Sequence, residues 1–570
     1  MKTLKNSLYI ILATITLSCN SSFLERVPQG ELSTPQIQNP DGVESVLIGA
    51  YALLNGNRDG TWGNYASAPS QWLFGDVAAD NAHKGSTSGD QATMSAIEGY
   101  APNPDNEHLG VMWTRYYEGV SRANRTLSLL AAVQGGSGDK VSATRATEIE
   151  AEAKMLRAHY YFYLVRLFKN IPYVDETLSA SEAVKVANDK DVYPMIEADL
   201  KFAADNLPVA KPKGEVGRVD KIAAKAYLGK VYLYLKKYQE ANTLFEEVIA
   251  AKPALTTLSF TDNFDITKEN GPESIFAVQH SINPDGGGHN ANVGDMLSGF
   301  YGTAPVSCCG FFQPSIDLAS AFQVGADGLP LSTTAYRAKP VKSDFGLTGS
   351  AFDNFTPDKT QKLDPRIDYT LGRRGVPFRD WGVMPGNAWI RDVGYGGPFV
   401  AYKHTIELAQ FSGNTQPGEP YVTGLNVNII RLADVYLMAA ETAVETGNLS
   451  RALQLVNAVR ERAAKLPAKA VNGSPVADYT VKPYAAFANA DAARSAIRQE
   501  RRLELALEGH RWFDLVRWGI AETVLNSYVS FEGSILSSAT GTFKSINTYY
   551  PIPQGQIDIS QGALKQNDGY

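Results

Sequence analysis

The sequence predicts a mainly all-α protein, a tetratricopeptide-like helical-hairpin superhelix that carries an irregular, loop-rich lobe. Residues 221–253 match the tetratricopeptide pattern, and residues 431–464 hold a second, weaker copy of it. Between the two copies, residues 252–430 are rich in glycine, proline and aromatic residues. A segment of this length is too long for a structureless loop in a compact protein, so it is expected to form the lobe.

The first copy places small and large residues where two packed helices require them. Gly229 and Ala241 are small enough to let the helices approach closely, while Tyr232 and Phe245 are placed to fill the space between them. The leading tryptophan of the pattern is replaced by Lys225. Because a single hairpin of this kind cannot bury its own apolar face, several hairpins are expected to stack.

Further helices are predicted before the first copy. A short helix is expected over residues 42–54 and a long one over 111–133. Another is expected over 144–168, where apolar residues recur at helical spacing until Pro172 ends the pattern. The helices over 144–168 and 192–207 are candidates for a third hairpin.

Length and composition fit one interwoven globular domain over residues 41–570. The chain has 570 residues, of which 44% are hydrophobic and 20% are charged, so it can bury a large core. The repeat scaffold is expected over 111–251 and 431–519, and a ligand-binding insert over 252–430. The formal net charge is -7 and no segment is dense in lysine and arginine, which excludes nucleic acid as the partner.

The N-terminus carries the pattern of an export signal. Two lysines precede an apolar run over residues 8–17, which is too short to span a bilayer. The run ends at a serine followed by Cys19, so residues 1–18 are predicted to be a signal peptide and Cys19 a lipidated cysteine that anchors the chain. Ordinary cleavage beside an incidental cysteine is the alternative. Residues 19–40 are mostly polar or turn-forming, as expected of a tether.

No catalytic or metal-binding constellation is predicted. Glu500, Glu504 and Glu508 recur on one helical face, but arginines alternate with them, so a structural charge network is expected in place of a glycosidase pair. These arginines are Arg498, Arg501, Arg502 and Arg511. Asp76 and Asp80 are expected in capping or turn roles, since a hard cation needs a denser set of oxygen ligands. The histidines show no metal-ligand spacing, and no cofactor is implied.

Beyond Cys19, the cysteines of the chain are the adjacent pair Cys308 and Cys309. Free buried thiols and a vicinal disulfide are equally consistent with such a pair in an oxidising exterior. A redox motif is not indicated, because it needs a spacing that lets two thiols swing together.

The insert is the segment in which a ligand site is predicted. Flat aromatic rings stack on the apolar faces of sugars, and this glycine- and proline-rich segment presents several rings. The candidate ligand-binding residues are Tyr301, Phe311, Phe312, Arg374, Trp381 and Trp389. Packing in a small core of the lobe is the alternative for each ring. Arg373 and Arg374 could bind a ligand carboxylate or form ion pairs inside the protein. We favour the ion pairs. The candidate partners are Asp364, Asp368 and Asp380.

Several long segments carry a family resemblance. They include GDVAADNA at 75–82, AEAKMLRAHYYFYLVRLFKNIPYVDE at 151–176, ERRLELALEGHRWFDLVRWG at 500–519 and the C-terminal YYPIPQGQIDISQGALKQNDGY. In this order they resemble the SusD/RagB group of outer-membrane nutrient-binding lipoproteins. The resemblance covers essentially the whole mature chain.

The resemblance implies a lipid-anchored protein that faces the cell exterior and sits as a lid on a SusC-like TonB-dependent outer-membrane transporter. It implies an oligosaccharide as the ligand, with a peptide or another non-glycan nutrient as the alternative. In that group the pocket also draws on the loop after the 75–82 segment, so His83 and Tyr100 are added as candidate ligand-binding residues. A hydrolase and a scaffold without a small-molecule site are the competing functions.

Overall fold

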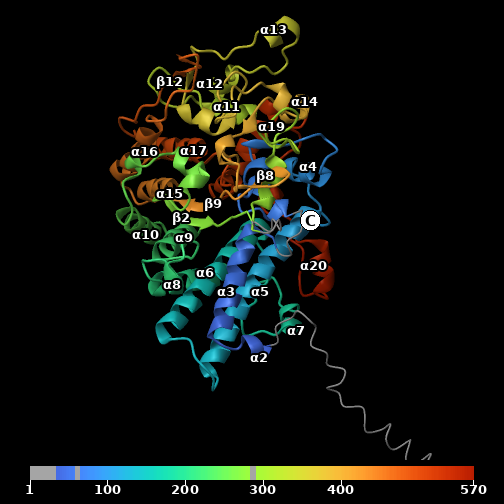
Figure 1. Ribbon diagram of the computed structural model, residues 1–570, viewed down its shortest axis with the longest axis vertical. Helices are drawn as coiled ribbons and strands as arrows, with labels where there is room; N and C mark the ends of the chain where they lie inside the picture. The colour runs from blue at the N-terminus through green and yellow to red at the C-terminus, as the bar shows by residue number, and fades with distance from the viewer. Residues whose placement is uncertain (1–33, 58–63, 283–289) are drawn as a thin grey trace, which may run out of the picture.

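The computed structural model describes residues 34–57, 64–282 and 290–570, so the predicted signal peptide and Cys19 lie outside the described residues. In Figure 1, long helices occupy the lower part and the left side of the molecule, and short elements joined by loops occupy the upper part. The predicted fold class is confirmed, because the long helices form a superhelix and the loop-rich part forms a lobe.

The scaffold is a series of helices in which each packs on the next. The order of packing follows the chain as far as α10, which then packs on α15 across the whole insert. The helices are α3 (Pro40–Ala52), α5 (Glu107–Gly135), α6 (Ala143–Phe168), α8 (Tyr193–Asn206), α9 (Lys221–Tyr234), α10 (Tyr238–Ala250), α15 (Leu432–Glu445), α16 (Leu449–Ala463) and α17 (Ala490–Leu505).

The predicted hairpins are confirmed. The first copy of the repeat forms α9 and α10, where a Cβ atom on Gly229 would lie only 2.7 Å from the ring of Phe245. Glycine therefore permits the close approach that the pattern predicts. The second copy forms α15 and α16, which are joined at Gly447 with a φ of 84°. Helices α6 and α8 pack on each other as expected of the third hairpin.

The insert leaves the scaffold and returns to it at one place. Strand β2 (Ser274–Val278) pairs antiparallel with β9 (Val427–Arg431), so the two ends of the lobe are joined by backbone hydrogen bonds. The β2–β9 pair at the base of the lobe and the direct contact of α10 with α15 together explain how a long insertion leaves the superhelix continuous.

The remaining elements are short. The helices are α2 (Thr34–Ile37), α4 (Ala92–Glu98), α7 (Ala180–Ala183), α11 (Ile316–Ala321), α12 (Thr333–Ala338), α13 (Gly349–Asp353), α14 (Val393–Gly396), α18 (Arg511–Arg517), α19 (Ala521–Glu532) and α20 (Gln554–Ile559). Antiparallel pairs join β1 (Ala82–Gly85) to β3 (Phe311–Pro314), β5 (Leu371–Gly372) to β6 (Val400–Ala401), β7 (Thr415–Gln416) to β8 (Glu419–Thr423) and β10 (Ala470–Val471) to β11 (Ser474–Pro475). Strand β4 (Lys362–Leu363) pairs parallel with β12 (Asp478–Tyr479).

Two apolar cores hold the molecule together. The larger runs through the superhelix and reaches into the lobe. The smaller lies within the lobe, and its ring-bearing members are Phe260, Phe264, Phe300, Tyr369, Phe378, Trp389 and Tyr402, with Trp381 packed against them. The rings of Phe300 and Trp389 lie 5.9 Å apart, and those of Phe378 and Trp381 lie 5.2 Å apart. Part of the aromatic content of the insert therefore builds a core.

A buried ion network connects the lobe to the scaffold. Glu504 accepts hydrogen bonds from Arg431 at 2.7 Å and Arg366 at 3.0 Å, and it also pairs with Arg462. Burial alone would raise the pKa of Glu504, but these three guanidinium groups hold it well below its ordinary value. Since Arg366 belongs to the lobe and Arg462 to α16, one carboxylate joins three separate segments.

The two neighbouring glutamates extend this network. Glu500 contacts Arg366 at 2.7 Å and Arg460 at 2.8 Å, and Glu508 accepts a hydrogen bond from Lys403 at 2.6 Å. The structural charge network expected from the sequence is thus confirmed, but its partners come from distant segments. The interleaved arginines point elsewhere: Arg501 pairs with Asp434 and Asp514, Arg502 with Asp80 and Asp317, Arg511 with Asp80, and Arg498 lies over Trp518.

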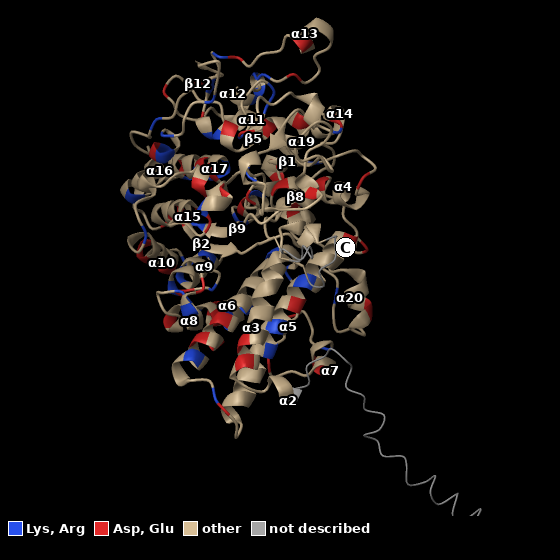
Figure 2. Ribbon diagram, in the orientation of Figure 1, with Lys and Arg blue, Asp and Glu red and all other residues tan. Residues whose placement is uncertain are grey.

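Charged side chains of both signs alternate along the scaffold helices. In Figure 2, lysines and arginines are interspersed with aspartates and glutamates on α5, α6 and α8.

Within residues 34–57, 64–282 and 290–570, none of the helices combines the length and the apolar character needed to cross a bilayer.

Candidate functional site

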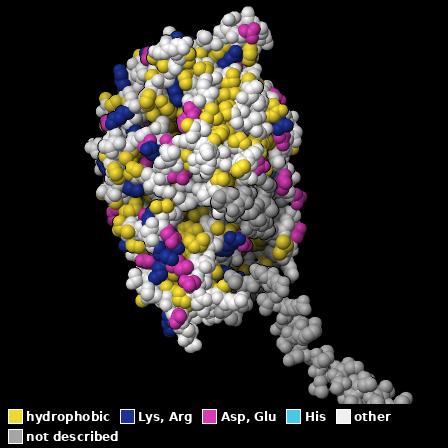
Figure 3. Space-filling model, viewed as in Figure 1, with side chains coloured by type: hydrophobic (Ala, Val, Ile, Leu, Met, Phe, Trp, Pro, Cys, Tyr) yellow, Lys and Arg dark blue, Asp and Glu magenta, His cyan; other side chains and the backbone are white. Residues whose placement is uncertain are grey.

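A group of partly exposed tyrosines lies where the lobe meets the N-terminal part of the chain. We call this group the tyrosine surface; it consists of Tyr65, Tyr301 and Tyr421 together with Asp90, Arg391, Cys308 and Cys309. Tyr301 is 40% exposed, and the other members are partly or fully accessible. On the face shown in Figure 3, hydrophobic side chains gather over the upper half of the molecule, where the lobe lies.

The loop from residue 299 to 310 positions Tyr301. It folds back on itself, so that the backbone N–H of Cys308 donates to Phe300 O at 2.7 Å and that of Gly310 donates to Gly299 O at 2.8 Å. Cys308 and Cys309 are joined by a disulfide bond on the returning arm of this loop, opposite Gly299 and Phe300. The structure thereby decides between the two alternatives that the sequence left open for the pair.

Arg391 lies beside Tyr301 and fixes one side of the surface. Its guanidinium group lies over the Tyr301 ring, 5.4 Å from the centroid. The same group donates to Asp90 at 2.9 Å and to Ser86 at 3.0 Å. Because Arg391 is held by a carboxylate and a hydroxyl, the orientation of the Tyr301 ring is defined before a ligand arrives.

Tyr65 and Tyr421 form the other side. Tyr65 lies in the 3-10 helix η3 (Tyr65–Ser67) and Tyr421 in β8, and both elements pack on η9 (Val293–Ser298). Burial raises the pKa of Tyr65, with the charges of Asp90 and Tyr421 adding to the effect, which places these groups near one another. A Cβ atom on Gly299 would lie 2.8 Å from Tyr421 Cβ and 3.0 Å from Cys308 Cβ, so glycine lets the loop lie against Tyr421.

The arrangement suits a saccharide. Tyrosine rings offer flat apolar surface to the C–H face of a sugar, and their hydroxyl groups hydrogen-bond its hydroxyls. Asp90 supplies acceptors and Arg391 supplies donors at the same place. Most contacts would be formed by groups that the protein already holds in position, which lowers the entropic cost of binding.

The structure places most of the other candidate ligand-binding residues in the interior. His83, Tyr100, Phe311, Phe312 and Trp389 are buried, and Trp381 and Arg374 are half-buried. The Phe312 ring lies between Trp72 and His404, with centroids 5.6 Å and 5.1 Å away, and Tyr100 packs edge-on against Phe543. Burial of this extent favours packing roles, and of the eight candidates Tyr301 has the ring that is open to solvent.

His83 illustrates why position in the chain was a poor guide. Its Nδ1 lies 2.9 Å from Glu98 and its Nε2 lies 3.0 Å from Glu532, so both ring nitrogens are occupied. Burial alone would lower the pKa of His83, but the hydrogen bonds to Glu532 and Glu98, with their negative charge, raise it to about 9. An imidazolium held by two carboxylates joins β1, α4 and α19 and has no atom left for a ligand.

The paired arginines of the insert make internal contacts. Arg373 forms a two-point ion pair with Asp368, with distances of 2.7 and 2.9 Å, as the favoured interpretation predicts. Arg374 pairs with Asp344 at 3.4 Å, a partner that the sequence did not indicate, and its guanidinium lies 3.9 Å from the Phe352 ring centroid. Neither arginine requires a ligand to satisfy its charge.

Asp76 and Asp80 were expected in capping or turn roles, and the structure shows that they join their segment to α17, Gly509 and α18. Asp76 accepts the backbone N–H of Gly509 at 2.7 Å and the amide of Asn81 at 2.8 Å, while Asp80 pairs with Arg511 at 2.7 Å. Burial raises the pKa of Asp76 to about 6. Across the described part of the chain, no group of three or more His, Cys, Asp or Glu side chains is arranged to hold a metal ion.

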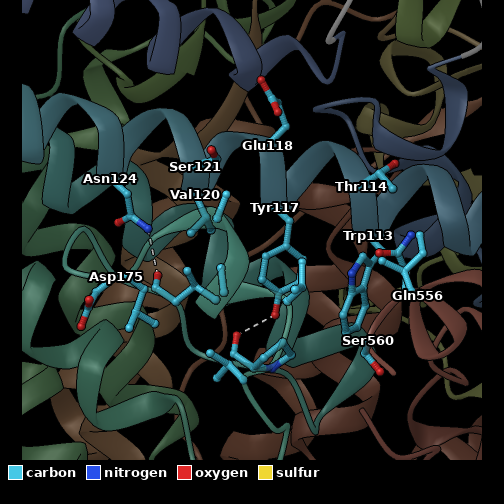
Figure 4. A pocket seen from close by; sticks show the side chains of 18 of the residues that line it. Trp113, Thr114, Tyr117, Glu118, Val120, Ser121, Asn124, Asp175, Gln556 and Ser560 are labelled. Atoms are coloured by element: carbon cyan, nitrogen blue, oxygen red, sulfur yellow. Dashed lines mark hydrogen bonds between the residues drawn. The ribbon is translucent and has the colours of Figure 1, made fainter. Parts of the chain in front are cut away.

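A second surface is a groove of about 700 Å³ between α5, residues 172–186 and α20 (Figure 4). Its wall is fixed by two hydrogen bonds: Tyr117 donates to Pro172 O at 2.7 Å, and Asn124 donates to Val174 O at 2.9 Å. Trp113, which lines it, is buried and presents little ring surface. The exposed apolar side chains in the groove are aliphatic: Leu178 at 37%, Val184 at 48% and Ile559 at 62% exposure.

Most residues of the tyrosine surface could not be recognised from the sequence. Tyr65, Asp90, Arg391 and Tyr421 are far apart in the chain and belong to no motif. Their proximity depends on how η3, β8 and the 299–310 loop pack on η9. Among the tyrosines of this surface, the composition of the insert indicated Tyr301, because it lies in a glycine-rich loop.

Comparisons with known proteins define the class. A family model described as "SusD family" matches residues 272–570, and one described as "Starch-binding associating with outer membrane" matches residues 22–233. SusD-like protein P25 of Formosa agariphila is 24% identical, covering 99% of this chain and 98% of its own. The fold also matches a "Laminarin binding SusD-like protein" (TM-score 0.65, 24% identity, 93% of this chain and 100% of that chain). Surface glycan-binding protein A of Bacteroides thetaiotaomicron in complex with laminarihexaose matches with a TM-score of 0.63 at 20% identity, over 93% of this chain and 99% of that chain.

These matches agree with a helical-repeat scaffold that carries a loop-rich lobe. Because the first family model covers more than half of the chain, the protein belongs to the SusD family. The solved structures are less than 25% identical to this chain and therefore support its fold.

Proposed function

We propose that this protein is a lipid-anchored outer-membrane protein that binds an oligosaccharide at the tyrosine surface, without altering it, and delivers it to a SusC-like TonB-dependent transporter. The observation that carries the proposal is the exposed ring of Tyr301, held by Arg391 beside Tyr65 and Tyr421. Structurally similar proteins that are described as laminarin- or glycan-binding support a glycan as the ligand class. No cofactor is needed for binding of this kind.

A binding role also fits the state of the carboxylates. Glycoside hydrolysis needs two carboxyl groups on opposite sides of the scissile bond. The regularly spaced Glu500, Glu504 and Glu508 are instead held by guanidinium and ammonium groups inside the protein. These side chains are therefore proposed to stabilise the fold.

Replacing Tyr301 with alanine is expected to weaken oligosaccharide binding by about tenfold or more, because loss of a well-placed aromatic contact costs roughly 1.4 kcal/mol. Titration calorimetry with laminarihexaose, maltohexaose, cellohexaose and xylohexaose provides the measurement. Tyr301→Phe keeps the ring and is expected to keep most of the affinity. A peptide mixture is the parallel arm; binding of peptides and of no glycan would replace the proposed ligand class.

The groove is proposed to face the transporter. Gln38 donates to Ala132 O on α5, about one helical turn beyond the groove residue Ser128. The chain therefore leaves the body toward its N-terminus at one end of the groove. If Cys19 is lipidated, residues 19–33 span at most about 50 Å, which keeps this end near the membrane.

The chemistry of the groove suits a protein segment. Aliphatic side chains do not stack on sugars as aromatic rings do, but they bury apolar side chains of a partner. The rim carries Glu118, Asp175, Glu176 and Arg125, but Glu118 is paired with Arg122 at 2.9 Å and Glu176 with Arg157, so the charges of the rim are largely balanced. We therefore assign the groove to an extracellular apolar segment of the transporter.

Replacing Ile559 with glutamate is expected to reduce recovery of the transporter by about tenfold, because a charge is placed in an apolar contact. The measurement is affinity purification from detergent-solubilised outer membranes, with mass spectrometry of the TonB-dependent transporter that co-purifies. Val209→Glu is the matched control, since Val209 is 66% exposed and lies outside the groove. Equal recovery with both variants would exclude the groove as the docking site while leaving glycan binding intact.

A further inference from the structure

We propose that the Cys308–Cys309 disulfide is a positioning element of the tyrosine surface, so that the protein binds its saccharide tightly when the bond is formed and weakly when it is reduced. The inference rests on the proposed function in one respect, because it takes the ligand of the tyrosine surface to be a saccharide. Beyond the proposed function, the inference states that the affinity for the saccharide depends on whether this disulfide is formed.

The disulfide lies between Tyr301 and Tyr421, two members of the tyrosine surface. Cys308 Cβ and Tyr421 Cβ are both within 3.0 Å of the point that a Cβ atom on Gly299 would occupy. On the other side, Gly310 directly follows the pair, and a Cβ atom there would lie 3.0 Å from Arg391 Cβ and 3.8 Å from Tyr301 Cβ. The arm that carries the disulfide therefore lies beside Tyr421 on one side and beside Tyr301 and Arg391 on the other.

The backbone of the bonded pair also holds the arm that carries Tyr301. The N–H groups of Cys308, Cys309 and Gly310 donate to carbonyl groups of Gly299 and Phe300, the residues directly before Tyr301. The carbonyl oxygen of Cys309 lies 3.5 Å from the Arg391 guanidinium. Fixing the two cysteines relative to each other thus orients three backbone donors and one acceptor that set the position of Tyr301 and Arg391.

Global stability does not explain such a bond. A disulfide stabilises a fold mainly by closing a loop in the unfolded chain, and this gain grows with the number of residues enclosed. Adjacent cysteines enclose the shortest loop possible, so the unfolded chain loses little freedom. The bond acts instead on the local conformation of two residues, and those residues lie at the candidate site.

The bond is accessible to a reductant. Both cysteines are partly exposed, in contrast to the buried rings of Phe300 and Trp389 beside them. A dithiol such as dithiothreitol reduces the pair by exchange: one thiolate attacks a sulfur, the second displaces the mixed disulfide, and the cysteines gain two electrons and two protons while the dithiol becomes a cyclic disulfide. Reduction frees this arm of the loop and removes the constraint on Tyr301.

The test compares four samples: the purified protein and its Cys308→Ser/Cys309→Ser variant, each with and without dithiothreitol. Mass spectrometry of the peptide that contains residues 308–309 establishes the redox state, since the bonded peptide is two hydrogens lighter. Affinity is measured by calorimetry with whichever of laminarihexaose, maltohexaose, cellohexaose or xylohexaose the oxidised protein binds. We expect the reduced protein and the double-serine variant to bind about tenfold more weakly than the oxidised protein. The unfolding temperature should differ by no more than about 2 °C among the samples.

Each outcome has a defined meaning. Equal affinity of the oxidised and reduced protein, or free thiols in the oxidised sample, would overturn the inference while leaving glycan binding at the tyrosine surface in place. Equal sensitivity of the double-serine variant to dithiothreitol would also overturn it, because that variant has no bond to reduce. Failure of the oxidised protein to bind any of the four glycans would remove the proposed ligand class and the inference with it.

Discussion

Replacing Glu504 with glutamine is expected to lower the free energy of unfolding by about 3 to 5 kcal/mol. Glu504 is fully buried and accepts hydrogen bonds from Arg431, Arg366 and Arg462. Glutamine keeps the size of the side chain but removes its charge. Several guanidinium groups then remain buried with fewer negative charges to compensate them.

Urea denaturation followed by tryptophan fluorescence measures this change. Glu461→Gln is the matched control, because Glu461 is exposed on α16 next to Arg462 and the same substitution there is expected to change stability by less than about 0.5 kcal/mol. A loss below about 1 kcal/mol for Glu504→Gln would show that the network contributes little. The same variant also tests for hydrolysis. We expect its folded fraction to bind glycan, and we expect neither the variant nor the unsubstituted protein to turn the glycan over.

Replacing His83 with glutamine is expected to cost about 3 kcal/mol at pH 6 and progressively less as the pH rises toward 10. The pKa of His83 is raised to about 9 in the folded protein, against about 6.5 for an unfolded histidine. Each unit of difference between the two pKa values corresponds to about 1.4 kcal/mol. Because the folded pKa is the higher one, the charged imidazole contributes its full stability below pH 6.5. The contribution is lost as the pH rises through 9.

Unfolding curves of both proteins between pH 6 and pH 10 provide the measurement. His159→Gln is the matched control: His159 is also buried, but burial and the neighbouring cations lower its pKa to about 3, so it is neutral throughout this range. Its cost should be independent of pH over the same interval. A cost for His83→Gln that is equally flat would mean that the imidazole is neutral in the folded protein and that Glu98 and Glu532 do not hold a charged ring.

Some features of the buried ion network could be predicted from the sequence. The alternation of Glu500, Glu504 and Glu508 with arginines indicated a structural charge network, and the structure shows that this network is buried. The alternation did not indicate that Arg366, Arg431 and Arg462 supply the partners, since ion pairs form across space between helices and the lobe. The same reason explains why Arg374 pairs with Asp344, which was not among the aspartates considered.

The aromatic residues of the insert show the same limit. Their composition is consistent both with a ligand surface and with a small core, because a ring buries its surface equally well against a sugar or against another ring. Packing decided the matter: Phe300 and Trp389 point into the lobe's own core, and the neighbouring Tyr301 points to solvent. Two adjacent residues in a loop can therefore have opposite roles that no local pattern distinguishes.

By itself, the sequence determined the helical hairpins, their stacking and the existence of the lobe. These features follow from spacing along the chain: Gly229 and Phe245 meet because a helical hairpin brings fixed positions together. Only the tertiary structure decided which residues form the tyrosine surface, whether Cys308 and Cys309 are bonded, and where the groove lies. The tyrosine surface and the groove depend on contacts between segments far apart in the chain, which are fixed by the packing of the whole core, whereas the disulfide depends on the local backbone conformation of the 299–310 loop.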